Sequence, residues 1–506
     1  MIIEAATLPA DTELTADVCI IGAGPAGLTV AQQLISSGLD VVVLESGEED
    51  YDERTQALAG ATLVGDGFRF NGAELDVAQT RLRQLGGTSN HWTGQCRPLD
   101  AHDFDQRDAV ANSGWPFGAD ELAPHYKRAV TSCQLAVNEW APTWWHDHTG
   151  APILVDTDTV STSVFQFSPP TRFGPELKPA LAAAKHVRVV LGATALELQV
   201  TPDGSRVQAV TVSTLDGQHS SVKPGVVVVA TGGIEPARLL LLSNGVNPAG
   251  LGNDHDVVGR YFMEHPHAIA GRARFVPSAD LSFSVIGGRT IPGAGDRLVW
   301  AGLSPTAKAQ ADAGIGHGVA LMFGAGGGSP REDREQATVP ADAVDQLVTL
   351  GAGTASAPVL TVRVEQEPNP DNRVTLGDDL DGLGQRRAVV TWRMHPPDWH
   401  TVRTTIELIA DALGRAGLAR IEIDPSGKPI EEWPVEIGNH HMGTTRMHAD
   451  PAHGVVDAQC QVHGIDNLYV CGSSVFPTSG MANPTLTIVA LAHRLADHLR
   501  REVRRR

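Results

Sequence analysis

The stretch ADVCIIGAGPAGLTVAQQLISSGLDVVVLES, residues 16–46, is the strongest indication of the fold. Its two short apolar runs, VCII and VVVL, are rich in β-branched residues and are typical of buried parallel strands. The segment between them, AGLTVAQQLISS, has the apolar spacing of a helix. The stretch therefore predicts a strand, a glycine-rich turn, a helix and a second strand, which is the beginning of a parallel sheet.

The turn carries the pattern GxGxxG at Gly22, Gly24 and Gly27. The first glycine permits a tight turn, the second lets a pyrophosphate approach the backbone, and the third lets helix and strand pack closely. Glu45 follows at the end of the second strand, where an acid can hydrogen-bond a ribose hydroxyl. These residues predict a dinucleotide site at the start of the helix, and they suit a flavin and a nicotinamide dinucleotide equally.

Composition excludes several classes of function. A formal net charge of −20 over 506 residues argues against a nucleic-acid partner, which requires a basic surface. The five cysteines are widely spaced without a CxxC pair, so we expect a reducing compartment and no thiolate zinc site. The N-terminus lacks the basic and apolar regions of a signal peptide, and no run of about twenty apolar residues occurs, so we expect a cytoplasmic protein without a membrane span.

Further along, a helix is predicted to begin near Ala119, after Trp115 and Pro116. Residues 186–230 contain strand-like pieces with Asp-Gly turns that close on the apolar strand VVVVATGG. Residues 276–435 contain more strand-like pieces and end with the helical TVRTTIELIADALGRAGL, which indicates a separate, largely antiparallel domain. The last segment again predicts a strand, a Gly/Ser turn and a helix.

These pieces together make the chain similar to the glucose-methanol-choline (GMC) oxidoreductases, an FAD-dependent family. Besides GAGPAGL with Glu45, the matching motifs are GGTSNHWTG, SGWPFGADELAPHYKRA, ATGGIEPARLLL, FMEHP, EQEPNPDNRVTL, HHMGTTRM and GMANPTLT. The HW after GGTS and the form HxMGTxRM resemble the branch with pyranose 2-oxidases and glycoside 3-oxidases. Asn90 departs from that branch, because it stands where a threonine is expected.

The resemblance implies an α/β (overall α+β) fold, in which a Rossmann-like FAD-binding domain is interleaved with a substrate domain built on a largely antiparallel sheet. The FAD-binding domain is expected from residues 1–100, 185–275 and 450–506. The substrate-binding domain is expected from residues 101–184 and 276–449.

Four histidines lie in EIGNHHMGTTRMHADPAHG, residues 436–454, namely His440, His441, His448 and His453. From the residues alone, a metal site, a base and a solvated loop are all open. In the family pattern the first histidine is the base that takes the proton of the substrate hydroxyl, which corresponds to His440. In an extended segment His441 faces the opposite side, so we expect His441, His448 and His453 to be structural or solvated and no metal to be bound.

Asn483 matches the second catalytic position of the family, where an amide can hydrogen-bond the substrate hydroxyl. Because Pro484 follows it, Asn483 is also predicted to cap the last helix, and both roles can hold. His91 matches a histidine that carries the flavin covalently in some pyranose oxidases, and covalent and noncovalent contact are both open. The residues expected to bind FAD are Gly22, Gly24, Gly27, Glu45, Gly87, Asn90, His91, Thr231, Gly472, Ser473, Pro484 and Thr485.

The function implied by the resemblance is oxidation of a CH–OH group of a sugar, glycoside or aminoglycoside-type substrate to a carbonyl. His440 abstracts the proton, hydride passes to flavin N5, and dioxygen or a quinone-type acceptor reoxidises the FAD. A non-sugar alcohol, such as a sterol or an aryl alcohol, is less favoured because only 5% of the residues are aromatic. A catalytically silent flavoprotein and a nicotinamide dehydrogenase are also open.

Overall fold

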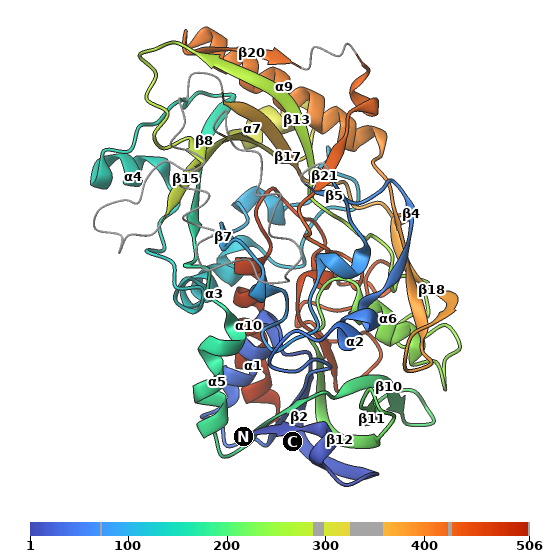
Figure 1. The fold of residues 1–506 in the computed structure, drawn as a ribbon. Coiled ribbons are helices and arrows are strands. Elements are labelled where there is room, and N and C mark those ends of the chain that lie inside the picture. Colours follow the sequence, from blue (N-terminus) through green and yellow to red (C-terminus); the bar gives the residue numbers. More distant parts are fainter. Residues whose placement is uncertain (71–72, 287–297, 324–357, 424–427, 504–506) are drawn as a thin grey trace.

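A computed structural model describes residues 1–70, 73–286, 298–323, 358–423 and 428–503 of the chain. Figure 1 shows two large sheets at opposite ends of the molecule, with both chain termini close together beside the first of them. The first sheet is formed by segments from the N-terminal half and the C-terminal end. The second is formed by segments from the middle of the chain.

The first sheet has the strand order β1-β9-β3-β2-β12-β11-β10, and β22 pairs with β12. Strands β1, β9, β3, β2, β12 and β22 pair in parallel, whereas β10, β11 and β12 pair antiparallel. This confirms the parallel unit predicted from residues 16–46. The bounds are β1 Ile2–Glu4, β2 Thr12–Ile21, β3 Val41–Leu44, β9 Val187–Leu191, β10 Thr194–Val200, β11 Val207–Ser213, β12 His219–Val229 and β22 Leu468–Val470.

Helices α1 (Pro25–Leu34), α3 (Ala119–Ser132), α5 (Phe173–Ala183) and α10 (Thr485–Glu502) form a layer beside this sheet (Figure 1). α1 packs on both α10 and α5, and α10 packs on α3. Val18, Cys19 and Ile20 of β2 are fully buried, because a parallel sheet with helices against it leaves its central strands no exposed face. The helix predicted to begin near Ala119 is present as α3.

The second sheet has the order β20-β13-β17-β16-β15-β8-β7, with β14 on β16 and β21 on β13. Every pairing is antiparallel except that of β14 with β16, which confirms the predicted antiparallel sheet. The bounds are β7 Gln95–Cys96, β8 Val160–Phe167, β13 Pro266–Phe275, β14 Val285–Ile286, β15 Val299–Pro305, β16 Gly318–Phe323, β17 Val359–Val364, β20 Ala419–Ile423 and β21 Val435–Ile437.

Helix α9 (Pro396–Arg415) packs against β15, β16, β17 and β20 of the second sheet. The buried side chains of α9 recur at helical spacing and include Val402, Ile406, Ile409 and Leu413, which face this sheet. The helix predicted in TVRTTIELIADALGRAGL is therefore confirmed, and it covers one face of the second sheet (Figure 1).

The remaining elements lie beside the two large sheets. A three-stranded sheet has the order β18-β19-β4, and α6 packs against β18 and β10. The bounds are β4 Ala61–Gly65, β5 Arg69–Phe70, β6 Ala73–Glu74, β18 Arg373–Leu380, β19 Arg386–Trp392, α2 Glu53–Gln56, α4 Pro142–Thr149, α6 Glu235–Leu242 and α7 Ala307–Ala313.

Sheet membership departs from the predicted domain bounds at two strands. β7 and β13 lie within the segments 1–100 and 185–275 that were expected to bind FAD, yet both are paired in the second sheet. β13 belongs there because it hydrogen-bonds to β17, β20 and β21. The division of the chain into two interleaved domains stays a prediction.

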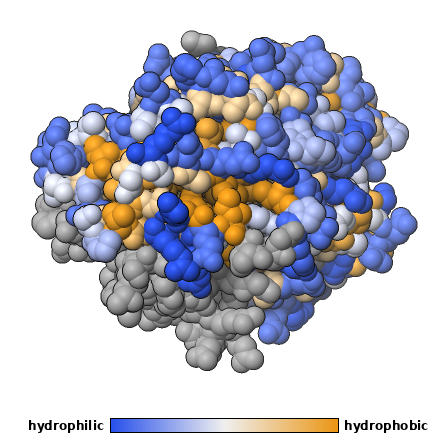
Figure 2. All heavy atoms as spheres, turned by 90° about the horizontal axis from the view of Figure 1, so that it is seen from above, coloured by the Kyte–Doolittle hydropathy of each residue, from blue (hydrophilic) through white to orange (hydrophobic). Residues whose placement is uncertain are grey.

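The end of the molecule that carries α9 and β20 has a mostly hydrophilic surface crossed by a band of hydrophobic side chains (Figure 2). Exposed large apolar residues here include Ile269 on β13, Val276 directly after β13, and Ile423 on β20. No helix in the described part of the chain combines the length and the apolar composition needed to cross a bilayer.

Candidate active site

The three glycines of the first turn have the three properties that the sequence predicts. Gly22 has φ +102°, and a Cβ there would lie 2.6 Å from the carbonyl oxygen of Ala230. A Cβ on Gly27 would lie 1.9 Å from the carbonyl oxygen of Gly22, so helix and strand meet at closest approach. A Cβ on Gly24 would meet nothing nearer than Gly87 Cα at 4.0 Å. The backbone at Gly24 is therefore open to a ligand, directly before α1.

Glu45 lies at the carboxyl end of β3, beside this turn. Its carboxylate accepts hydrogen bonds from the backbone N–H groups of Ala23 (2.8 Å) and Gly47 (2.9 Å). Burial raises the pKa of Glu45, and these two hydrogen bonds oppose the rise. Glu45 thus links the glycine turn to the end of β3, and its contact with a ribose stays a prediction.

The turns after β12 and β22 meet at the same edge of the sheet. A Cβ on Gly472 would lie 3.7 Å from the carbonyl oxygen of Gly232. The hydroxyl of Thr231 is buried and has no hydrogen-bond partner among the residues that the structure describes. A buried hydroxyl without a partner fits a site completed by a ligand, and the open backbone at Gly24 fits the pyrophosphate of FAD. Ser473 differs, because its hydroxyl donates to the carbonyl of His441 at 2.6 Å and only its backbone remains for a cofactor.

The loop GGTSNHW packs against the glycine turn. Gly86 and Gly87 have φ of +94° and +53°, and a Cβ on Gly87 would lie 3.0 Å from Gly24 Cα. The Asn90 side chain donates to the carbonyl of Leu85 at 2.9 Å, so its amide nitrogen closes the loop itself. His91 directly follows the short helix Gly87–Asn90 and is partly buried. The loop thus brings Gly87 against the glycine turn, and the contact of His91 with FAD stays a prediction.

The structure brings together the two residues predicted to be catalytic. Asn483 Nδ2 lies 3.3 Å from His440 Nε2, and Arg363 Nη1 donates to Asn483 Oδ1 at 3.0 Å. On the other side of the ring, His440 Nδ1 lies 2.8 Å from Nδ1 of His265. The backbone N–H of His440 donates to the buried carboxylate of Glu264 at 2.9 Å. His440 is therefore held on three sides, and the residue as a whole is partly buried.

The prediction that Asn483 caps the last helix is wrong. Pro484 occupies the N-cap of α10 in a helical conformation, and no side chain caps this end. The amide oxygen of Asn483 instead accepts from Arg363, a fully buried residue of β17. Asn483 therefore directs its amide to the site, and Pro484 and Thr485 begin the helix behind it.

The environment of His440 favours a neutral imidazole. Burial lowers its pKa well below the usual value, and the neighbouring His265 and Arg363 lower it further. Burial likewise lowers the pKa of His265 to about 3. An imidazole that stays neutral near physiological pH has a free ring nitrogen with which it can accept a proton.

His441 faces a different set of partners, as predicted for the neighbour of His440. Its Nδ1 lies 2.6 Å from a carboxylate oxygen of Glu264, and its Nε2 lies 2.7 Å from the Thr80 hydroxyl. The Thr80 hydroxyl donates to the carbonyl of Val77 at 2.7 Å, so it accepts from His441. The ring also stacks on Phe68 at 5.7 Å. His441 is thus a buried structural residue.

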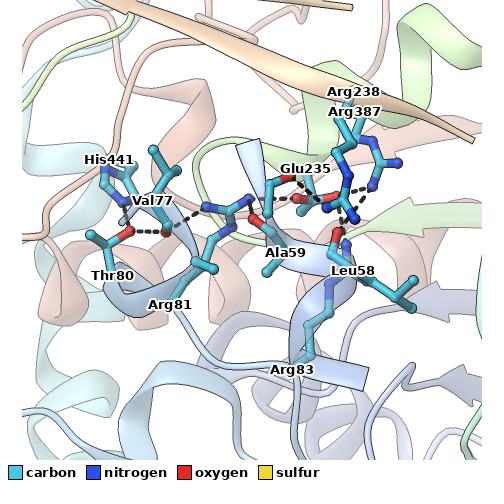
Figure 3. Close-up of polar contacts among 12 residues, drawn as sticks. Leu58, Ala59, Val77, Thr80, Arg81, Arg83, Glu235, Arg238, Arg387 and His441 are labelled. Carbon is cyan, nitrogen blue, oxygen red and sulfur yellow. Dashed lines mark hydrogen bonds and ion pairs between the residues drawn. The ribbon is translucent and has the colours of Figure 1, made fainter. Parts of the chain in front are cut away.

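The Val77 carbonyl, which accepts from Thr80, also connects this region to a charged cluster around Glu235 (Figure 3). Arg81 donates to the Val77 carbonyl at 2.9 Å and to Glu235 at 2.8 Å. Arg83 and Arg238 also reach the Glu235 carboxylate, at 2.7 and 3.3 Å. Burial alone would raise the pKa of Glu235, but the three guanidinium groups outweigh it and hold the pKa well below its usual range. The cluster ties the segment before the GGTSNHW loop to the start of α6.

The other two histidines of residues 436–454, His448 and His453, lie apart from this site. His453 is exposed and His448 is partly buried, and their rings contact each other at 5.4 Å. In the described part of the chain, one group elsewhere could hold a metal ion, namely His102, Asp103 and His317. Its atoms already pair with protein groups: His317 with Asp103 at 2.9 Å, and His102 with Gln310 at 3.1 Å. This geometry is that of a buried ion pair.

Three residues of the site were not singled out from the sequence. Glu264 and His265 belong to the motif FMEHP, to which no chemical role was given, and Arg363 lies in the strand-like piece VLTVRVEQ. An arginine within an apolar strand, and a Glu-His pair at the start of another, were the available signals. A charged group in a buried strand needs a specific partner.

Comparison with known proteins agrees with the fold and with FAD as the cofactor. Residues 15–241 match the FAD binding domain family, and residues 368–492 match the GMC oxidoreductase family. The fructose dehydrogenase large subunit of Gluconobacter japonicus is 26% identical and aligns over 96% of this chain and 97% of its own. The paromamine 6'-oxidase of Streptomyces fradiae is 27% identical, over 96% of this chain and 91% of its own.

Among solved structures, pyridoxine 4-oxidase from Mesorbium loti shares the fold with a TM-score of 0.55 at 17% identity, over 95% of this chain and 98% of its own. A glycine turn open to a dinucleotide, a match to the FAD binding domain family and relatives that align along the whole chain support one assignment. The protein is an FAD-dependent oxidoreductase that is similar to the GMC oxidoreductases.

Proposed function

We propose that this enzyme oxidises a CH–OH group of a sugar, glycoside or aminoglycoside-type substrate to a carbonyl, with His440 as the base. The observation that carries the proposal is the pair of His440 and Asn483, whose side chains meet at 3.3 Å between His440 Nε2 and Asn483 Nδ2. A hydroxyl bound between them donates its proton to Nε2 and accepts a hydrogen bond from the amide.

In the proposed reaction the two side chains divide the work. His440 takes the hydroxyl proton and holds it on Nε2, and Asn483 stabilises the negative charge that develops on the oxygen. FAD, when bound, supplies the acceptor for the hydride that leaves the carbon. Arg363 holds the Asn483 amide through its oxygen, so Nδ2 remains directed at the substrate position.

The residues that would hold FAD lie at the carboxyl ends of β2, β3, β12 and β22. The pyrophosphate fits at Gly24, where the backbone is open and no side chain of the N-cap residue caps the start of α1. Glu45 would contact the ribose, and the loop with Gly87, Asn90 and His91 would approach the ring. The N-terminus of α10, at Pro484 and Thr485, would favour negative charge on the ring through the helix dipole.

The substrate class rests on two relatives that align along the whole chain, a fructose dehydrogenase and a paromamine 6'-oxidase. A net charge of −20 would also raise the local concentration of a cationic glycoside at low ionic strength. The electron acceptor is proposed to be dioxygen or a quinone-type compound.

Anaerobic mixing with a substrate panel tests this proposal. The panel contains neutral sugars, glycosides and aminoglycosides, together with sterol and aryl alcohols as the competing class. Loss of flavin absorbance with one of the first three groups is the expected result. Bleaching by sterol or aryl alcohols alone would assign the enzyme to non-sugar alcohols. Subsequent mixing of reduced enzyme with dioxygen or a quinone identifies the acceptor.

A further inference from the structure

We infer that His265 is a positioning residue, which fixes His440 in the tautomer that carries its ring proton on Nδ1 and leaves Nε2 free as the base. The inference rests on the proposed role of His440. It is carried by a continuous chain of hydrogen bonds that passes through both imidazole rings, from the backbone carbonyl of Gly480 to the guanidinium of Arg363.

The first half of the chain is directed by a carbonyl group. His265 Nε2 lies 2.8 Å from the carbonyl oxygen of Gly480, which can only accept, so the proton of His265 is on Nε2. A neutral His265 then presents a lone pair at Nδ1. His440 Nδ1 lies 2.8 Å from that atom and must therefore donate, which places the proton of His440 on Nδ1.

The second half of the chain gives the same tautomer independently. Arg363 can only donate, and its Nη1 lies 3.0 Å from Asn483 Oδ1, so the amide oxygen faces the guanidinium. The Asn483 nitrogen then faces His440 Nε2 at 3.3 Å. An amide N–H donates, so Nε2 must be the acceptor. An acceptor-only group at one end and a donor-only group at the other thus require the same proton arrangement throughout.

The acceptor for His265 is itself held in place. The backbone N–H of Gly480 donates to Glu365 at 3.2 Å, and the Glu365 carboxylate forms two hydrogen bonds with Arg107, at 2.8 and 2.6 Å. His265 is fully buried, and its backbone N–H donates to the Glu264 carboxylate at 3.1 Å. The His265 ring therefore has a fixed position and a fixed partner on each nitrogen.

This arrangement matters because only one tautomer of His440 can act. A proton on Nε2 would leave no lone pair toward Asn483 and the substrate hydroxyl. Donation from Nδ1 to His265 also makes Nε2 a stronger base and holds the ring plane. Removing the acceptor leaves a buried Nδ1–H without a partner, so the ring can turn or exchange its tautomer.

Two substitutions separate this role from simple packing. In His265→Asn, the side-chain oxygen stands at the position of Nδ1 and can still accept from His440. In His265→Leu, a side chain of similar bulk offers no acceptor. His493→Leu is the matched control, since His493 is also buried and hydrogen-bonded, to Ser132 on α3 at 2.9 Å, and takes no part in this chain of hydrogen bonds.

The variants are compared by anaerobic stopped-flow, which gives the limiting rate of flavin reduction and the substrate Kd separately. We expect His265→Leu to lower the limiting rate about 10- to 100-fold with an unchanged Kd. His265→Asn should stay within about threefold of wild type, as should His493→Leu. Wild-type rates in His265→Leu, or equal losses in the Asn and Leu variants, would overturn the inference.

A spectroscopic measurement keeps the test independent of catalysis and of how well His265→Leu folds. In wild-type protein labelled with ¹⁵N-histidine, the His440 resonances, identified by their absence in His440→Ala, should report a protonated Nδ1 and an unprotonated Nε2. A proton on Nε2 would overturn the inference. Normal flavin reduction by His440→Ala would instead overturn the proposed function, so the two failures are distinguishable.

Discussion

His440 and Asn483 lie 43 residues apart in the chain, yet their side chains meet at 3.3 Å between Nε2 and Nδ2. His440 follows β21 of the second sheet, and Asn483 precedes α10, which packs beside the first sheet. Arg363 of β17 holds the Asn483 amide, and His265, just before β13, contacts the His440 ring. The candidate site is therefore assembled from strands of the second sheet and from the start of α10 in the helix layer beside the first sheet, and it depends on how the two meet.

Gly24→Ala should separate cofactor binding from folding. Gly24 has φ −82° and an added Cβ would meet no protein atom nearer than 4.0 Å, so the variant should fold with an unchanged Tm. The methyl group occupies the space proposed for the pyrophosphate, and the protein should purify with much less FAD. Gly27→Ala is the contrast, because its Cβ would lie 1.9 Å from a carbonyl oxygen and should destabilise the fold. Full FAD content in Gly24→Ala would show that the pyrophosphate does not lie at this turn.

Acid precipitation should release the cofactor. The contacts proposed for FAD are hydrogen bonds and the N-terminus of α1, so we expect yellow colour in the supernatant and a colourless pellet. A yellow pellet that becomes colourless in His91→Ala would show a covalent bond at His91. Colourless purified protein that takes up no added FAD would contradict the FAD assignment itself.

The rate of flavin reduction should change little from pH 8 to pH 6. His440 acts in its neutral form, and a histidine with an ordinary pKa would be half protonated at about pH 6.5 and lose activity below it. Burial lowers the pKa of His440 well below that value, so the base remains unprotonated throughout this range. The limiting reduction rate measured against pH checks this. A decline centred near pH 6.5 would mean that the base is exposed or is a different residue.

His441→Ala should lower stability, and His453→Ala should not. Removing the His441 ring leaves the fully buried carboxylate of Glu264 without its 2.6 Å partner, and breaking a buried pair in this way costs about 3 to 5 kcal/mol. The exposed His453 is the control, with an expected effect within about 0.5 kcal/mol. Denaturant unfolding of the two variants measures the difference, and equal stabilities would show that the Glu264 contact is not structurally important.

Local patterns in the sequence predicted the parts that depend on local structure. The unit β2-α1-β3 followed from two apolar runs and three glycines, because backbone geometry at the turn admits only glycine at Gly22 and Gly27. His440 followed from its place in a motif. The roles of His265 and Arg363 could not be predicted, since their partners lie 175 and 120 residues away along the chain.

The helix cap at Asn483 shows why a local pattern can mislead. Asn followed by Pro is typical of a helix N-terminus, whether or not the side chain turns back to the backbone. Here Arg363 provides a charged donor for the amide oxygen, and a hydrogen bond to a charged group is stronger than one to a backbone N–H. The tertiary contact therefore prevails over the local one.

Anaerobic stopped-flow of His440→Ala with a reducing substrate tests whether His440 is the base. Loss of a general base slows the chemical step by about 10²- to 10⁴-fold, while FAD binding should persist because the glycine turn is elsewhere in the molecule. We expect a normal flavin spectrum whose bleaching by substrate is slowed by that factor, with wild-type rates in the His448→Ala and His453→Ala controls. Flavin reduction at the wild-type rate in His440→Ala would contradict the assignment of His440 as the base.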